Sequence, residues 1–267
     1  MSATPIPRTL SMSYFADLDV SVIDELPKGR EAIVTKLFSE DRRDEILKRV
    51  HEVCQAGAQV YWVCPLIEES EALQLQTAEE TYLNMQSHFK DLKVGLVHGR
   101  MKSLEKQKVM SDFVKGTIQL LVATTVIEVG VDVPNATLMV IENAERMGLS
   151  QLHQLRGRVG RGSLKSRCIL LFQKKLSEVA RQRLKVIFEN TDGFIIAQED
   201  LNIRGPGEFL GVRQSGVPML RIANLNRDFK LLEEAKTIAD QLLENYPEAS
   251  HLHLKRWLSH ANERVKV

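Results

Sequence analysis

Short apolar runs alternate with longer amphipathic runs through the first two thirds of the chain, and this alternation constrains the fold most. The apolar runs are typical of buried strands, with many β-branched residues, and occupy residues 32–38, 59–65, 93–98, 118–123, 137–141 and 168–172. Helical spacing occupies residues 42–55, 73–89 and 103–115. Strands separated by helices indicate βαβ units and a parallel sheet. Strands that are apolar throughout indicate helices on both faces, so we predict a three-layer α/β fold.

The pattern changes after residue 172. Residues 177–189 and 195–201 predict a pair of helices, and residues 204–216 (R-G-P-G-E-F-L-G-V-R-Q-S-G) contain four glycines and a proline, which exclude a helix or a core strand. Residues 228–245 predict a strongly amphipathic helix, and residues 251–260 a final one. We therefore expect three parts: a linker over residues 1–30, an α/β lobe over 31–173, and a helical extension over 174–267.

Composition excludes several classes of protein. No apolar run reaches the roughly 20 residues of a membrane span, and no signal segment opens the chain. Three scattered cysteines, Cys54, Cys64 and Cys168, are too few for a disulfide framework or a zinc cluster. They are expected to be core thiols of a cytoplasmic protein. The histidines lack metal-ligand spacing, so no metal site is expected, and the phosphate-loop pattern G-x-x-x-x-G-K-[ST] does not occur.

The charge is balanced over the whole chain but uneven locally. The net charge is +1, yet residues 156–185 contain ten lysines and arginines against one acid, Glu178. A local basic surface on a neutral chain favours a polyanionic partner such as phosphate or nucleic acid. A solvated face with no partner is the alternative.

Residues 154–162, Q-L-R-G-R-V-G-R-G, concentrate arginine and glycine. Continued as a helix at about 100° per residue, they place Gln154, Arg158 and Arg161 on one face, and Leu152, Leu155 and Val159 on the opposite face. Glycine leaves space for a ligand to approach closely, and arginine forks match phosphate oxygens. We interpret this stretch as a phosphate-facing surface; arginines that only pair with surface acids are the alternative.

Two further segments follow predicted strands, where ligands bind in open parallel sheets. In residues 120–134 (L-L-V-A-T-T-V-I-E-V-G-V-D-V-P), the hydroxyls and amides at Thr124 and Thr125 suit phosphate oxygens, and Asp132 could bind a ribose hydroxyl or orient an arginine. The threonines could instead cap a helix. In residues 97–102 (V-H-G-R-M-K), a glycine beside Arg100 could contact a polyanion backbone. The loops at His98, Thr124 and Glu142 are therefore expected to carry the site, with no catalytic role for His98.

These stretches resemble superfamily 2 helicases. Q-x-x-G-R-x-x-R (154–161) is similar to their sixth motif, A-T-T-V-I-E-V-G-V-D-V-P to their fifth, and S-A-T-P-I-P-R-T at the start to their third. Order and spacing resemble the second RecA-like (P-loop NTPase-type) lobe over about residues 31–173. The stretch 200–216 (D-L-N-I-R-G-P-G-E-F-L-G-V-R-Q-S-G) is similar to the translocation motif of RecG and of the transcription-repair coupling factor. Pro206 and the helix from residue 228 favour the RecG family.

The RecG resemblance implies roles for particular residues. Arg161 would be an arginine finger on ATP and Arg158 its companion, with Gln154, Gly157, Gly130 and Asp132 near the nucleotide. Gly99, Arg100, Thr124 and Thr125 would lie on DNA. Arg183, Arg204 and Gln214 would couple the motor to translocation.

The resemblance also implies partners and a location. ATP and Mg²⁺ would be held mainly by a first lobe, and residues 1–30 would follow that lobe. Branched DNA (stalled forks and Holliday junctions), the first lobe and a wedge domain would be the partners of a monomeric bacterial protein near the nucleoid, in recombination and repair. Without a phosphate loop, this chain alone is expected to be inactive as an ATPase or helicase. The alternatives are the matching lobe of the transcription-repair coupling factor and a non-enzymatic DNA-binding module.

Overall fold

The computed structural model describes residues 31–64, 71–124, 132–162, 164–204 and 228–258. The strands are β1 (Val34–Ser39), β2 (Gln59–Val63), β3 (Val94–Val97), β4 (Leu120–Ala123), β5 (Ala136–Ile141) and β6 (Arg167–Phe172). The helices are α2 (Arg43–Gln55), α3 (Glu71–His88), α4 (Ser103–Val114), α5 (Leu149–Arg156), α6 (Glu178–Glu189), α7 (Gly193–Arg204), α9 (Phe229–Asn245) and α10 (Pro247–Leu258). Short 3-10 helices η1 (Glu40–Arg42) and η3 (Ala144–Arg146) follow β1 and β5.

The six strands form one parallel sheet in the order β1-β6-β5-β2-β4-β3. The four inner strands are almost entirely buried, as their continuous apolar sequences predict. The predicted α/β sheet is confirmed.

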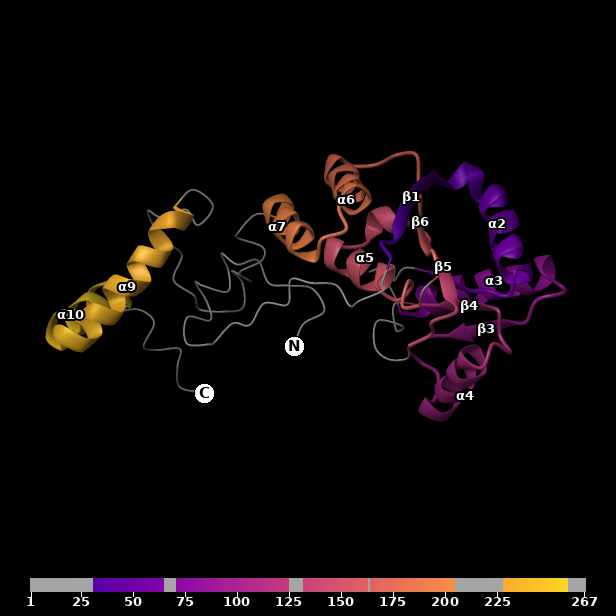
Figure 1. Ribbon diagram of the computed structural model, residues 1–267, viewed down its shortest axis with the longest axis horizontal. Helices are drawn as coiled ribbons and strands as arrows, with labels where there is room; N and C mark the ends of the chain where they lie inside the picture. The colour runs from indigo at the N-terminus through magenta and orange to yellow at the C-terminus, as the bar shows by residue number, and fades with distance from the viewer. Residues whose placement is uncertain (1–30, 65–70, 125–131, 163, 205–227, 259–267) are drawn as a thin grey trace. The chain divides into compact units, whose positions relative to one another are not determined.

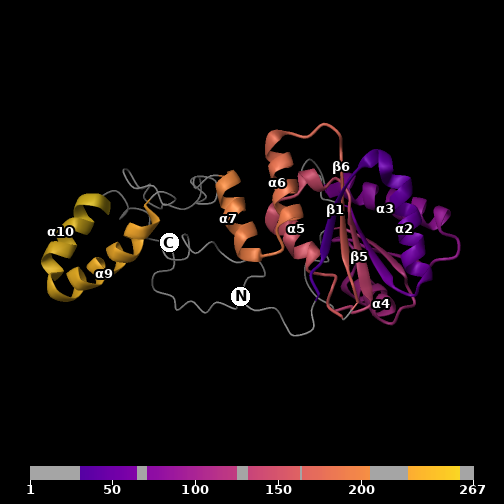
Figure 2. The same ribbon diagram turned by 45° about the horizontal axis from the view of Figure 1, so that its top comes forward.

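Helices cover both faces of the sheet, so the three-layer prediction is also confirmed. Successive side chains of a strand point to opposite faces, and β2 shows this directly: Trp62 packs with the helices α2 and α3, whereas Tyr61 packs with α4, α5 and α6. In Figure 2, α2 and α3 lie to the right of the strands, and α5 and α6 lie to the left.

The described residues divide between two compact units, one ending at Ile203 and the other beginning at Arg204. The pair α6–α7 belongs to the same unit as the sheet, because Leu184, Ile187 and Ile196 are buried in the core shared with α5. Helices α9 and α10 contact each other in the second unit (Figure 1). The division of the chain at residues 30 and 173 stays a prediction. Among the helices described, none combines the length and apolarity that crossing a bilayer demands.

The three cysteines are buried thiols, as expected from their apolar surroundings. Burial raises the pKa of Cys54 and of Cys168 from 9.0 to about 12, and raises that of Cys64 as well. A pKa raised on folding adds stability that is fully present below the unfolded value and is lost as the pH rises through the folded value. The window for these thiols therefore begins near pH 9.

We predict that the free energy of unfolding falls by about 1 kcal/mol per thiol between pH 9 and 10, because the unfolded thiols ionise first. Urea denaturation in the presence of a reductant, at pH 7, 9 and 10, measures this decline. A Cys168→Ala variant should be less stable at pH 7 but should lose about 1 kcal/mol less over that interval. An identical decline in the variant would contradict the assignment to the thiols.

Candidate functional site

The predicted site residues lie at two opposite edges of the sheet. At the carboxyl edge, backbone hydrogen bonds join the strand ends: Thr124 N donates to Val97 O at 3.1 Å, and Glu142 N donates to Val63 O at 2.9 Å. At the amino edge, Gln59 N donates to Asn135 O at 2.9 Å. Five-residue β2 separates the two edges by roughly 16 Å at about 3.3 Å per residue.

The arginine-rich stretch lies at the amino edge, not among the carboxyl strand ends where the site is predicted. Helix α5 ends at Arg156, and Gly157 is its C-cap. Gly160 has φ +69°, a left-handed conformation that an α-helix cannot contain. The prediction that one helix carries Gln154, Arg158 and Arg161 on a single face is therefore wrong, because the chain leaves the helix between them. The predicted buried face is confirmed, with Leu152, Leu155 and Val159 fully buried.

The glycines of this stretch make room for the protein itself. A Cβ on Gly160 would lie 2.9 Å from Cγ1 of Ile33, just before β1. A Cβ on Gly162 would lie 2.9 Å from the carbonyl oxygen of Pro134, just before β5. The space at these two glycines is therefore taken up by the protein and not by a ligand. Their lack of side chains lets a tight turn pack against the starts of two strands.

The turn formed by residues 157–162, here called the arginine turn, brings two predicted nucleotide residues together. Arg161 Nη1 lies 3.8 Å from Asp132 Oδ1, and Arg161 Nε donates to the carbonyl of Gly157 at 3.2 Å. The Arg161 and Asp132 side chains are 31% and 59% exposed, so both can reach solvent. Asp132 thus orients an arginine, one of the two roles considered for it.

Tyr61, which the sequence did not single out, lies under this group. Its side chain is buried and packs against Phe113 with ring centroids 4.9 Å apart. Burial raises the pKa of Tyr61 to about 12, Arg158 and Arg161 act to lower that pKa, and Asp132 acts to raise it. Arg158, Arg161 and Asp132 therefore all lie close enough to the Tyr61 phenol to act on its pKa.

Three of the four predicted DNA residues, Gly99, Arg100 and Thr124, follow neighbouring strands at the carboxyl edge. Gly99 and Arg100 lie just after β3 and are exposed, and the hydrogen bond from Thr124 N to Val97 O places Thr124 beside the end of β3. Lys106 Nζ donates to Gly99 O at 2.6 Å, which ties this loop to the first turn of α4. The Thr124 side chain is only 3% exposed. The surface here consists of Gly99, Arg100 and the start of a helix, a setting that favours anions.

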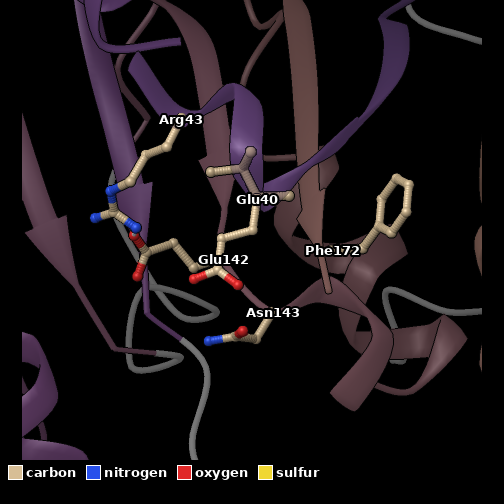
Figure 3. A pocket seen from close by; sticks show the side chains of 6 residues that line it. Glu40, Arg43, Glu142, Asn143 and Phe172 are labelled. Atoms are coloured by element: carbon tan, nitrogen blue, oxygen red, sulfur yellow. Dashed lines mark ion pairs between the residues drawn. The ribbon is translucent and has the colours of Figure 1, made fainter. Parts of the chain in front are cut away.

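Glu142, the third carboxyl-edge position, serves a structural ion pair. Its buried carboxylate contacts the guanidinium of Arg43 (Figure 3), and Arg43 also lies over the Trp62 ring at 5.1 Å. The shallow pocket around them is lined by Glu40, Arg43, Glu142, Asn143, Leu171 and Phe172. Two carboxylates against one guanidinium do not favour phosphate, so this part of the edge does not suit a polyanion.

Sequence reasoning missed one arginine of the same stretch. Arg156 is 3% exposed, and its guanidinium donates to the carbonyls of Ile187 and Asn190 at 2.8 Å each. It was counted as part of a basic surface. On the helical projection, however, it lies about 40° from Leu152, on the buried face, which was the available signal.

The translocation residues are only partly described. Arg183 lies on α6 and is half-buried, and Arg204 is the last residue of α7. Thr125, Gly130 and Gln214 lie outside the described residues, as do residues 1–30, which include the stretch similar to the third motif. The remaining lysines and arginines of residues 156–185 are not uniformly available to a partner, since Lys174 binds Asp41 at 2.6 Å.

The Gly160 contact predicts a large effect from one added methyl group. Gly160→Ala should destabilise the fold by roughly 2–4 kcal/mol, because left-handed backbone and overlap with Ile33 both oppose alanine. Gly57→Ala is the matched control, since Gly57 has φ +85° but nothing within 4 Å of an added Cβ; it should cost about 1–2 kcal/mol. Urea denaturation measures both, and equal losses would show that the packing against Ile33 is not important.

Comparisons with known proteins show which family the chain resembles. A family model described as helicase conserved C-terminal domain matches residues 41–163, and a second, described as ATP-dependent DNA helicase RecG, domain 3, C-terminal, matches residues 190–257. The chain is 55% identical to the ATP-dependent DNA helicase RecG of Acidithiobacillus ferridurans over 258 residues, 97% of this chain and 38% of that protein. It is 55% identical to the RecG of Escherichia coli K12 over 259 residues, 97% of this chain and 37% of that protein.

A solved structure shows the same fold. A structure of RecG bound to a three-way DNA junction is 47% identical and matches with a TM-score of 0.69, over 87% of this chain and 30% of that one. The chain spans a little over a third of the length of the curated relatives it matches. The sheet, its flanking helices and the order of the motifs are thus those of a RecA-like helicase lobe. The chain belongs to the RecG family and matches the C-terminal part of its members.

Proposed function

We propose that this chain is the second motor lobe of an ATP-dependent DNA helicase that remodels branched DNA. The observation that carries the proposal is the placement of two phosphate-suited groups at opposite edges of one sheet. Arg158, Arg161 and Asp132 form the nucleotide edge, and Gly99 and Arg100 form the DNA edge. A lobe built in this way can contact ATP and DNA at the same time without either ligand blocking the other.

The nucleotide edge fits the terminal phosphates of ATP. Arg161 is held by a long ion pair and one carbonyl, both replaceable, so its guanidinium can turn to a phosphate held by a facing lobe. Phosphoryl transfer is accelerated mainly by positioning and charge stabilisation, and a finger arginine supplies both. Arg158 adds a second positive charge beside it. We assign Gln154, Gly157 and Gly130 to the same edge.

ATP and Mg²⁺ are held mainly by a first lobe in this proposal, because the chain has no phosphate-loop sequence. Mg²⁺ held by that lobe would supply positive charge to the phosphates during the reaction. This chain supplies guanidinium groups, and it excludes water when the two lobes close.

The DNA edge fits the sugar-phosphate backbone rather than base edges. Gly99 exposes its backbone, Arg100 adds a cation, and the N-terminus of α4 begins three residues further on. Amides at a helix start together with an arginine bind phosphate without reading sequence. A motor that steps along DNA requires contacts of this kind. We assign Thr124 and Thr125 to this edge.

The wider role follows the names of the relatives. We infer that the protein acts in DNA repair and recombination, as a cytoplasmic monomer associated with the bacterial nucleoid. Its partners are forks or Holliday junctions, and a first lobe and wedge domain of the same polypeptide. The 55% identity to RecG proteins and the likeness to RecG on a three-way junction support this role. Arg183, Arg204 and Gln214 are proposed to couple the motor to translocation.

The arginine-finger assignment predicts a loss of turnover without a loss of DNA binding. In the full-length protein, Arg161→Ala should lower DNA-stimulated ATP hydrolysis by about 10³-fold or more, because the transition-state charge loses its stabilising cation. Steady-state ATPase assays with saturating junction DNA measure this. Arg49→Ala, an exposed arginine of α2 paired with Glu52, is the matched control and should remain within about twofold. Near-normal turnover in Arg161→Ala would refute the assignment.

The DNA-edge assignment predicts weaker DNA binding without a loss of turnover. Arg100→Ala should raise the DNA concentration for half-maximal ATPase stimulation several-fold, with little change in kcat at saturating DNA. If Arg100 contacts one phosphate, the slope of log affinity against log salt should become shallower by about 0.7–0.9. Fluorescence anisotropy with labelled junctions over a salt series measures it, again beside Arg49→Ala. An unchanged salt slope would remove Arg100 from the DNA surface.

A further inference from the structure

Arg156 is a buried cation whose hydrogen-bond acceptors are all uncharged. Its guanidinium donates to the carbonyls of Ile187 at 2.8 Å, Asn190 at 2.8 Å and Thr191 at 3.4 Å. It also donates to the hydroxyl of Thr35 on β1 at 3.3 Å. Burial lowers the pKa of Arg156 from its ordinary value, yet arginine stays charged at cellular pH. Removing the partners of a buried charge is strongly destabilising, so these bonds hold the segments that they join firmly together.

The three carbonyl acceptors all belong to one structural feature, the end of α6 and its turn into α7. Helix α6 ends at Glu189, and Ile187 O is among its last four carbonyls. The last four carbonyls of a helix have no donor from a further helical turn. Asn190 and Thr191 form the connection to α7, which begins at Gly193. A cation at this position stabilises the carboxyl end of a helix. The guanidinium therefore fixes the α6–α7 turn to α5.

Arg156 directly precedes the arginine turn in the chain. Arg156 is the last residue of α5, and the next residue, Gly157, accepts the Arg161 Nε hydrogen bond at 3.2 Å. Arg161 in turn meets Asp132. A continuous series of contacts thus runs from the Asp132–Arg161 pair through the arginine turn to Arg156, and from its guanidinium to the α6–α7 turn.

We propose that Arg156 is a positioning residue that couples the nucleotide edge to the α6–α7 pair. When the arginine turn shifts as the lobes close, the α6–α7 turn must move with it, because losing any one of the carbonyl bonds would leave a buried charge poorly solvated. Helix α6 carries Arg183, and α7 ends at Arg204. Arg156 thereby links hydrolysis to the helices that lead into the glycine-rich segment. This inference rests on the proposed function.

The test measures ATP hydrolysis and the conversion of junction DNA separately. In the full-length protein, Arg156→Lys keeps the charge but loses the planar fork that reaches several carbonyls. Two rates are measured on the same three-way junction DNA: ATP hydrolysis and conversion of the junction. We expect hydrolysis within about twofold of the unaltered protein, and at least a fivefold fall in junctions converted per ATP. Arg49→Lys, on α2, should change neither rate.

A purely structural role for Arg156 gives a different result. Both rates would then fall in the same proportion with the folded fraction, and the yield per ATP would be unchanged, which overturns the inference. An unchanged yield at normal rates overturns it as well. An unaltered protein with no DNA-stimulated ATPase or junction conversion would instead refute the proposed function itself.

A second variant keeps the test decisive if Arg156→Lys does not fold. Thr35→Val keeps the volume of the buried Thr35 side chain on β1. It removes only the 3.3 Å hydrogen bond from the Arg156 guanidinium to the Thr35 hydroxyl. We expect a smaller fall in yield per ATP, about twofold, with hydrolysis unchanged. A proportional fall in both rates, or no fall in yield, would overturn the coupling role.

Discussion

A sheet in which every strand runs the same way forces each connection to carry the chain back from the carboxyl edge to the amino edge. The rest of the structure depends on this constraint. Residues that follow a strand, such as Gly99 and Thr124, gather at one edge. Residues that precede a strand, such as Asp132 before β5 and the arginine turn before β6, gather at the other. The separation of the candidate site residues into two groups on one small lobe follows from the direction of the chain.

The connection between β4 and β5 has a special position in this arrangement. It begins at Thr124 beside the DNA edge and has reached the nucleotide edge by Asp132. One segment of chain therefore has an end at each proposed ligand. The guanidinium of Arg156 makes a second link, from the nucleotide edge to the helices beyond the sheet. The link through Arg156 consists of hydrogen bonds to backbone carbonyls, so it does not depend on the rotamers of surface side chains.

The sequence predicted the strands and helices well because their signal is local. Buried strands such as β2 are continuously apolar, and the face of α5 carrying Leu152 and Leu155 was recognised by its spacing. The end of α5 was not, because Val159 is buried both in the continued helix and in the actual turn, and so cannot distinguish them. The lack of space for a side chain at Gly160 comes from Ile33, 127 positions earlier in the chain, a contact that no local pattern reveals.

The residues of the candidate site could be predicted from the sequence, but their positions on the sheet could not. Spacing and residue type selected Asp132, Arg158 and Arg161, and the structure places them in one neighbourhood. Which edge they occupy depends on where a helix stops. Tyr61 and Arg156 were missed because their importance comes from burial against distant elements, Phe113 for the phenol and the α6–α7 turn for the guanidinium.

The burial of all three cysteines has a practical consequence for studies of lobe movement. Cys54, Cys64 and Cys168 are the complete set in this sequence, and none reaches the surface. Maleimide reagents require an accessible thiolate, which these side chains do not offer. A cysteine introduced at an exposed position on α2 or α4 would therefore react selectively. Fluorophores for distance measurements could be attached there without removing the thiols of this chain, and the core that those thiols fill would stay intact.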